Sequence, residues 1–207
     1  MRKLVAISHV TLDGVMQAPG GPDEDRSCGF EHGGWSFPFA DEDFNRLVNG
    51  WFAQADAFLL GRRTYETFAA FWPLVADAAD PVASPLNALP KYVASRTLEA
   101  VTWQNTTLLE GDVAEEVAKL KERPGRELQV HGSGDLLQTL MAHDLIDEHR
   151  LLVYPVVVGS GRRLFREGAA PRSLKLVDAT TTSTGVVVAT YRRGGPLVTG
   201  GFTIEEP

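Results

Sequence analysis

Short apolar runs recur along the chain between polar segments, and they predict buried strands. They lie at residues 4–7, 57–60, 92–94, 128–131, 150–158 and 186–191. The longest of them, 150–158, contains Pro155, which favours an edge strand or a bend because proline has no backbone N–H to donate. The pattern therefore predicts a protein built around a sheet.

Between these runs, apolar residues recur every three or four positions, which is typical of an amphipathic helix. The clearest such face follows Asp41 and consists of Phe44, Leu47, Val48, Trp51, Phe52 and Ala55. Further helices are predicted over 64–70 and 113–120, and again from Gly134 onward. Helices and strands thus alternate over most of the chain.

This alternation predicts an α/β domain with a mostly parallel central sheet and helices on both faces. The last strands have no helix between them, which predicts an antiparallel C-terminal edge. Two segments rich in glycine or proline, 17–38 and 73–90, are predicted to be a long loop and a surface excursion. We expect a single domain over 1–207, in which 194–207 forms either one more short strand or a tail.

Composition and charge narrow the functional classes. With 207 residues, 43% apolar and 23% charged, the chain has ordinary globular usage. The 20 basic and 27 acidic side chains give a net charge of −7, so no nucleic-acid partner is expected. No apolar run is long enough to cross a membrane, and the single cysteine, Cys28, suits a reducing compartment. We therefore expect a cytoplasmic protein with no membrane partner.

Three polar or glycine-rich turns each follow a predicted strand, and these turns carry the candidate chemistry. They are Gly61 to Thr64, Ser95 to Thr97 and Gly132 to Gly134. Ligands of open α/β sheets bind at the carboxyl ends of strands, and helix N-termini bind anions. We interpret the turns as a site for a ligand with several phosphates. The alternative is that the glycines only turn the chain and the arginines are solvated.

The order and spacing of five segments resemble the dihydrofolate reductase-like superfamily. The segments are 11–14, 60–66, 94–98, 130–134 and 155–161. Within that superfamily, the chain looks closest to the reductase domain of the bifunctional riboflavin-biosynthesis deaminase-reductase and to its stand-alone bacterial relatives. The resemblance covers roughly residues 2–193.

The resemblance implies NADPH as the cofactor. It places the pyrophosphate at one turn, the adenosine 2′-phosphate at the next, and the pyrophosphate and nicotinamide at the third. The corresponding residues are Gly61, Arg62, Arg63 and Thr64, then Ser95 and Arg96, then Gly132, Ser133, Gly134 and Leu136. Asp135 departs from this pattern, because a carboxylate beside the third turn is unfavourable for an anion.

On the substrate side, Asp41 follows Trp35 at nearly the spacing of the family's pterin-binding carboxylate. The resemblance makes Asp41 a proton handler or substrate anchor, whereas its position also fits a helix N-cap. Asp13 lies in the loop that closes over the nicotinamide in the family. His9 lies near the family's active-site wall, and Trp35 can stack on a flat ring, although both also suit a packed interior.

We therefore expect an NADPH-dependent reductase of a small pyrimidine- or pteridine-like heterocycle, resembling 5-amino-6-(5-phosphoribosylamino)uracil reductase. A homodimer is expected, with the strand 151–158 as a candidate dimer face. The histidines show no metal-binding spacing, so no metal is expected. The alternatives are a true dihydrofolate reductase, a non-catalytic NADPH-binding protein of the same fold, and a structural domain whose turns bind nothing.

Overall fold

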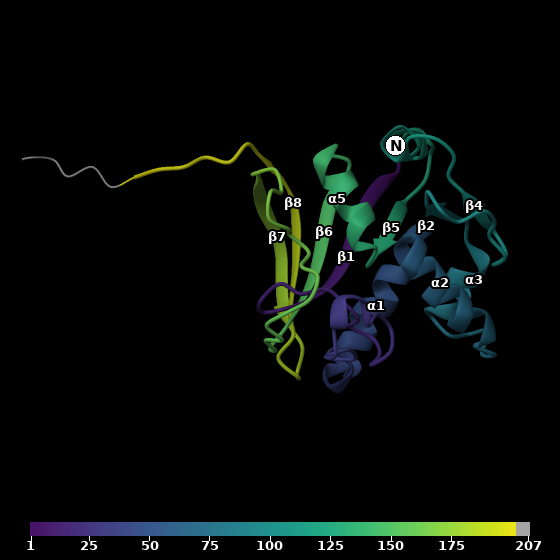
Figure 1. The fold of residues 1–207 in the computed structure, drawn as a ribbon, viewed down its shortest axis with the longest axis horizontal. Coiled ribbons are helices and arrows are strands. Elements are labelled where there is room, and N and C mark those ends of the chain that lie inside the picture. Colours follow the sequence, from purple (N-terminus) through teal and green to yellow (C-terminus); the bar gives the residue numbers. More distant parts are fainter. Residues whose placement is uncertain (202–207) are drawn as a thin grey trace, which may run out of the picture.

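A twisted sheet of eight strands runs through the computed structural model, which describes residues 1–201 (Figure 1). Its order is β4-β3-β2-β5-β1-β6-β8-β7. The strands are β1 (Lys3–Thr11), β2 (Ala55–Gly61), β3 (Lys91–Ala94), β4 (Thr106–Leu108), β5 (Glu127–His131), β6 (Glu148–Tyr154), β7 (Ser173–Thr181) and β8 (Val187–Gly195). Strands β4 to β6 along this order pair in parallel, and β8 pairs antiparallel with both β6 and β7. The predicted parallel sheet with an antiparallel C-terminal edge is confirmed.

Five α-helices connect or cover the strands in the described chain. They are α1 (Glu42–Gln54), α2 (Arg62–Phe71), α3 (Ala83–Ala88), α4 (Val113–Glu122) and α5 (Gly134–Ala142), and short 3-10 turns occur at Ser27–Gly29, Phe37–Phe39 and Trp72–Leu74. Helix α3 corrects the prediction of a plain surface excursion over 73–90. Its Ala83 and Leu86 are completely buried, so this segment contributes to the core.

The helices pack on both faces of the sheet because each presents one apolar side. On one face, α4 and α5 pack on β1, β2 and β5 through a cluster that includes Leu4, Leu59, Val117, Leu128, Leu137 and Leu140. On the other face, α1, α2 and α3 pack through clusters that include Val5, Ile7, Phe52, Phe58, Tyr65 and Leu86. Strand β1 is buried on both sides, which explains its continuous apolar run.

Strand β6 corrects the prediction for the run 150–158. The strand ends at Tyr154, and 156–158 belong to the following loop. It pairs with β1 on one side and β8 on the other, so it is an interior strand and does not offer an open dimer edge. Pro155 follows the last paired residue, where its missing N–H interrupts nothing.

The outer hairpin of β7 and β8 forms one end of the sheet, and α2, α3 and β4 lie at the opposite end (Figure 1). The side chains of β7 are mostly exposed, and its sequence lacks a sustained apolar pattern. Because few of its side chains are buried, no run or alternation of apolar residues marks this strand in the sequence.

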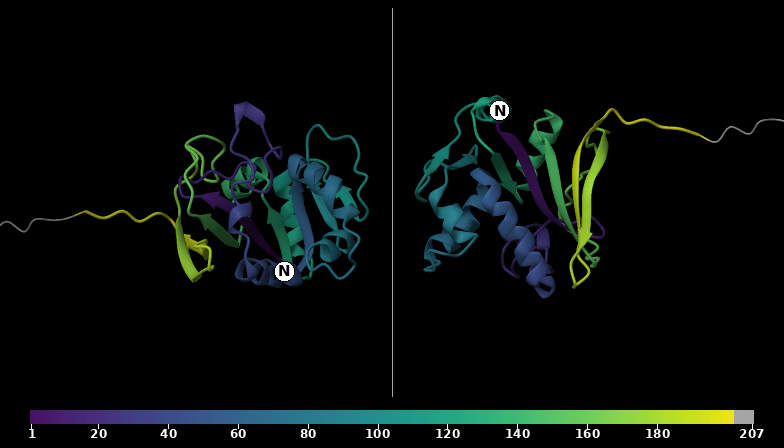
Figure 2. Two further views of the ribbon diagram at one scale, coloured as in Figure 1. Left: turned by 90° about the horizontal axis from the view of Figure 1, so that it is seen from below. Right: turned by 180° about the vertical axis from the view of Figure 1, so that it is seen from behind.

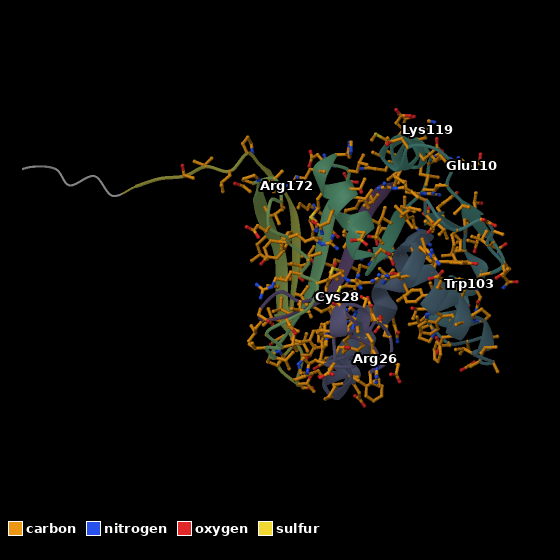
Figure 3. All side chains as sticks on the ribbon, viewed as in Figure 1. Arg26, Cys28, Trp103, Glu110, Lys119 and Arg172 are labelled. Carbon is orange, nitrogen blue, oxygen red and sulfur yellow. The ribbon has the colours of Figure 1, made fainter. Side chains whose placement is uncertain are left out.

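Beyond β8, residues 196–201 extend away from the domain without regular structure (Figure 2). The prediction of a further strand or tail over 194–207 starts inside β8, and its last part, 202–207, lies outside the described residues. Cys28 is exposed on the long loop 17–38, together with Arg26 (Figure 3). Over residues 1–201, none of the helices is both long and apolar enough to cross a membrane.

Candidate functional site

One cleft of about 740 Å³ lies at the carboxyl ends of β1, β2, β3 and β5. It is lined by each of the ten residues for which the sequence predicted cofactor contacts. These are Gly61, Arg62, Arg63, Thr64, Ser95, Arg96, Gly132, Ser133, Gly134 and Leu136. Parallel pairing explains their meeting, because it brings the carboxyl ends of neighbouring strands to the same edge of the sheet. The role of these residues in binding stays a prediction.

Two of the turns are locked together by hydrogen bonds. The Gly61 N–H donates to Ser133 Oγ over 2.9 Å, and the Ser133 N–H donates to Thr64 Oγ1 over 3.1 Å. The two turns also lie close together, since a Cβ at Gly61 would be in van der Waals contact with the Cβ of Ser133, at 3.4 Å. The two turns therefore form one rigid wall of the cleft.

The helices that leave these turns present open N-termini to the cleft. Gly132 and Ser133 adopt left-handed φ angles of +56° and 60°, which start α5 sharply from the end of β5. Neither Gly61 before α2 nor Ser133 before α5 makes a side-chain capping bond. The backbone N–H groups of both first turns and the two helix dipoles are thus available to an anion.

The turn after β3, Ser95 to Thr97, is shaped by Ser95. Its Oγ accepts hydrogen bonds from the N–H groups of Thr97 and Leu98, at 3.2 and 3.0 Å. Arg62 joins this turn to α2, because its guanidinium donates to Glu66 at 2.7 Å and to Thr97 Oγ1 at 2.6 Å. Arg96 is exposed and forms no ion pair within residues 1–201, so its guanidinium is free at the mouth of the cleft.

Three acidic residues also line the cleft, and two of them, Glu24 and Asp25, were not predicted from the sequence. Asp25, on the long loop 17–38, forms ion pairs with Arg63 and Arg162. Asp135, the departure noted in the sequence, pairs with Arg166 at 2.6 Å, which offsets its charge. No local pattern marks Asp25, Arg162 or Arg166, since all three lie on irregular loops. A phosphate near Arg63 would compete with the Asp25 carboxylate.

Two histidines lie on the floor of the cleft, on the side of α1. His9 lies two residues beyond the end of the pairing between β1 and β5, and its Nδ1 is 2.7 Å from Tyr154 Oη. His131 ends β5, stacks on Phe52 at 4.7 Å, and contacts Gln129 Oε1 through Nε2 at 3.1 Å. Burial lowers the pKa of His9 to about 4 and that of His131 to about 3, so both rings are neutral near pH 7.

Asp41 is not among the residues that line the cleft, and its role as a proton handler or substrate anchor stays a prediction. It is the N-cap of α1, where its Oδ1 accepts from the Phe44 N–H at 2.7 Å. Its Oδ2 accepts from Ser183 Oγ at 2.8 Å and from the Thr184 N–H and hydroxyl at 3.0 Å each. These donors hold the carboxylate ionised, and the Phe44 bond first among them lowers the pKa of Asp41 to about 2. The structure shows Asp41 in the position of a helix N-cap, which its place in the sequence also fitted.

Replacement of Asp41 by asparagine is expected to lower stability at pH 7, and the loss should shrink as the pH falls. The pKa of Asp41 is depressed in the folded state, so its stabilisation is present above the unfolded pKa of about 3.9 and is lost as the pH falls toward 2. Urea midpoints of both proteins at pH 7, 4 and 2.5 measure this. A difference in midpoint that stays constant over this range would contradict the role of the ionised carboxylate.

Asp13 and Trp35 also lie outside the lining of the cleft. Asp13 accepts from Thr11 Oγ1 at 2.6 Å and from the Gly159 N–H at 2.9 Å, so it ties the turn after β1 to the loop after β6. The Thr11 bond is the main reason why the pKa of Asp13 lies below its ordinary value. Trp35 is buried, donates to the Gln17 carbonyl at 2.8 Å and packs edge-on against Tyr154. Its ring is therefore part of the core and is not free to stack on a heterocycle.

A second depression of about 770 Å³ lies at the far end of the sheet, around Trp103 and Asn87. Asp77 is the one titratable side chain in its lining, so it offers little chemistry. Within residues 1–201, no three histidine, cysteine or acidic side chains come together as a metal site. The cleft at the carboxyl ends of the strands is therefore the candidate active site.

Comparisons with known proteins agree with this architecture. The family model described as the RibD C-terminal domain matches residues 2–188. The "Uncharacterized protein YyaP" of Bacillus subtilis is 30% identical over 196 residues, which cover 94% of this chain and 96% of that protein.

Solved structures with less than 25% identity show the fold. A putative riboflavin biosynthesis protein from Shewanella sp. PV-4 aligns with a TM-score of 0.65 and 22% identity, covering 92% of this chain and 98% of that one. A diaminohydroxyphosphoribosylaminopyrimidine deaminase/5-amino-6-(5-phosphoribosylamino)uracil reductase from Thermotoga maritima aligns at 0.60 and 15%, covering 93% and 56%. Dihydrofolate reductase from Enterococcus faecalis, complexed with NADP(H), aligns at 0.59 and 14%, covering 93% and 96%. The fold is therefore of the dihydrofolate reductase type.

Proposed function

Because this chain belongs to the RibD C-terminal domain family, we propose that it is an NADPH-dependent reductase of a small heterocyclic compound. The observation that carries the proposal is the convergence of three phosphate-suited turns on one cleft, two of them at uncapped helix N-termini. The Thermotoga maritima neighbour, which is named as a uracil-compound reductase, supports a pyrimidine-like substrate. A pteridine-like compound has the same size and polarity and remains in the proposed class.

The residues of the cleft suit each part of NADPH. The first turns of α2 and α5 would bind the pyrophosphate through backbone N–H groups. Arg96 and the hydroxyl of Ser95 would bind the 2′-phosphate, since a guanidinium matches a phosphate with paired, charge-assisted bonds. Gly61 has no side chain, so nothing projects from this part of the cleft wall toward the pyrophosphate. A Cβ at this position would contact Ser133.

When bound, NADPH supplies the hydride, so the protein has to orient the acceptor and exclude water. The floor of the cleft is formed by His9, Met16, His131 and Leu136, which present mainly apolar surface and neutral rings. An uncharged, flat ring fits such a floor. The charged residues Arg62, Arg63, Arg96 and Arg166 belong to the turns and loops of the cleft, where the phosphates would lie.

Titration with NADPH and NADH at two salt concentrations tests the proposal. We expect NADPH to bind more tightly than NADH, and its affinity to fall as salt screens the arginines. Oxidation of NADPH, followed by its absorbance, should then appear with a uracil or pterin acceptor. Absence of binding of either nucleotide would refute the reductase function. Binding without turnover of any acceptor would indicate a non-catalytic NADPH-binding protein.

We further propose that the chain works in the cytoplasm as a homodimer with a small-molecule substrate. The exposed, unpaired Cys28 agrees with a reducing compartment. The dimer face over 151–158 stays a prediction; because β6 is paired on both sides, such an interface would be formed by side chains and not by an open strand edge. Light scattering would give the mass in solution, and a monomeric mass would refute the dimer.

A further inference from the structure

His9 occupies an unusual position in the cleft, because one of its ring nitrogens is anchored and the other is open. Nδ1 is 2.7 Å from Tyr154 Oη, and the two rings lie nearly parallel with centroids 5.6 Å apart. Phe44 contacts the imidazole edge-on at 6.0 Å. Nε2 bonds to no residue of the described chain and is not among its buried unpartnered atoms, so it is accessible from the cleft that His9 lines. The ring is therefore oriented with one free polar atom.

Tyr154 is suited to hold this orientation because it is buried and packed between other rings. It is 1% exposed, and the edges of Trp35 and Phe39 pack against its ring at 5.2 and 5.8 Å. Burial raises the pKa of Tyr154 above its ordinary value, so the hydroxyl keeps its proton. The nearby Ser36 hydroxyl donates to the Pro19 carbonyl at 2.7 Å, and His9 Nδ1 is the one hydrogen-bond partner of Tyr154 Oη in the described chain. Tyr154 thus offers a permanent O–H group to His9.

These contacts select the tautomer of His9. A buried phenol loses stability if its O–H has no acceptor, and Nδ1 is the acceptor at hydrogen-bonding distance. The pKa of His9 near 4 keeps the ring neutral, so it carries one proton. When Tyr154 donates to Nδ1, that proton is on Nε2. The cleft therefore contains a fixed, uncharged N–H donor on its floor.

We propose that His9 recognises the substrate by donating a hydrogen bond from Nε2–H to a carbonyl oxygen or an unprotonated ring nitrogen. This inference rests on the proposed function, and it specifies which end of the heterocycle meets the sheet. The bound end is uncharged, because His9 and its neighbour His131 are both neutral and desolvated. His131 is less suited to this role, since its Nε2 already contacts Gln129 and its ring is stacked on Phe52.

The test uses 5,6-diaminouracil as the probe and NADP⁺ to form a complex that does not react. In wild type with NADP⁺, long-range ¹H–¹⁵N spectra should show His9 protonated at Nε2 from pH 5.5 to 8, and the probe should shift that signal. His9→Phe, which keeps a flat ring without a donor, should weaken probe binding about 5- to 100-fold by calorimetry, since the carbonyl loses its partner in a dry site. His9→Gln should recover part of the affinity because it keeps an N–H donor.

Two further variants complete the test. Tyr154→Phe should give a mixture of His9 tautomers and an intermediate loss of probe affinity. His143→Gln, at an exposed position after α5, should behave as wild type. The affinity of each variant for NADP⁺ shows that it is folded.

The outcomes separate the two proposals. Wild type that binds no NADP⁺ refutes the proposed reductase. Wild type that binds NADP⁺ but whose His9→Phe variant binds the probe within twofold of wild type refutes the role of His9 alone. An Nδ1-protonated His9, or a complex with NADP⁺ that binds neither the uracil probe nor pterin, overturns the inference as well.

Discussion

Replacing Arg96 with alanine is expected to weaken NADPH binding by about 10- to 100-fold and to leave NADH binding unchanged. The guanidinium of Arg96 is exposed at the mouth of the cleft and forms no ion pair within residues 1–201. Binding a phosphate therefore costs it no existing partner. Charge-assisted hydrogen bonds contribute about 1.5–3 kcal/mol, and each 1.4 kcal/mol corresponds to about tenfold in affinity.

The other arginines of the cleft lack this freedom. Arg62 is bonded to Glu66 and Thr97, and Arg63 is paired with Asp25. A phosphate that binds either of them has to displace a bond that already exists, so each is expected to contribute less to the preference for NADPH. This distinction depends on the structure, because in the sequence the three arginines look equivalent.

Fluorescence or calorimetric titration of both nucleotides, at low and moderate salt, measures the effect of Arg96→Ala. Arg46→Ala is a matched control, since Arg46 is an exposed arginine of α1 whose partner is Asp43 and which lies outside the lining of the cleft. An unchanged ratio of the NADPH and NADH affinities in Arg96→Ala would remove the 2′-phosphate from this turn.

Replacing Arg150 with methionine is expected to lower the free energy of unfolding by about 3–5 kcal/mol. Arg150 lies at the centre of a buried ion cluster that consists of Lys3, Glu127, Glu148, Arg150 and Arg192. Its guanidinium donates to Glu127 at 2.6 and 3.1 Å and to Glu148 at 3.1 Å, and it lies over the ring of Trp51. Removing the arginine leaves the buried Glu127 carboxylate without its cation and takes one of three cations from the buried Glu148 carboxylate.

The charges in this cluster depend on one another. Burial alone would raise the pKa of Glu148, but the hydrogen bonds from Lys3 and Arg192 outweigh it, and the pKa lies below its ordinary value. Glu148 therefore stays ionised in the folded protein and needs its cations. For this reason a substitution at Arg150 costs much more than the loss of its packing.

Urea unfolding of Arg150→Met against wild type measures this loss. Arg192→Met is the matched control, because Arg192 also bonds to Glu148 but has a side chain that is 55% exposed. Loss of such a partly exposed pair should cost under about 1 kcal/mol. Adding Glu127→Gln and Glu148→Gln to Arg150→Met should recover part of the stability, since the uncompensated charges are then removed. A loss below about 1 kcal/mol for Arg150→Met would show that water reaches the cluster.

Much of the fold could be predicted from the chain because its signals are local. Strand β2 is buried on both faces and therefore contains the continuous apolar run 57–60. Helix α1 has a periodic apolar side and an Asp at its N-cap. The elements without such a signal were missed: β7 is mostly exposed, β4 has three residues, and α3 is a short helix inside a proline-rich segment.

The candidate site likewise has one part that the sequence predicted and one part that it did not. The three turns were predictable, because each follows a strand and parallel pairing takes every such turn to one edge of the sheet. The substrate side was not. Asp41 fitted the family's carboxylate by spacing alone, and the hairpin at Ser183 and Thr184, about 140 residues away, determines where its oxygens are used.

By itself, the sequence determined the α/β class, the parallel sheet and the set of polar and glycine-rich turns that follow its strands, since periodicity and turn composition are properties of neighbouring residues. The tertiary structure alone decided which polar atoms remain free. It pairs His9 with Tyr154 across 145 residues, places Asp25 on Arg63, and leaves Arg96 without a partner in the described chain. Such pairings depend on the packing of elements that are distant in the sequence. The physical reason is that a buried donor or acceptor bonds to whichever polar group the fold brings within reach, and it is then no longer free for a ligand.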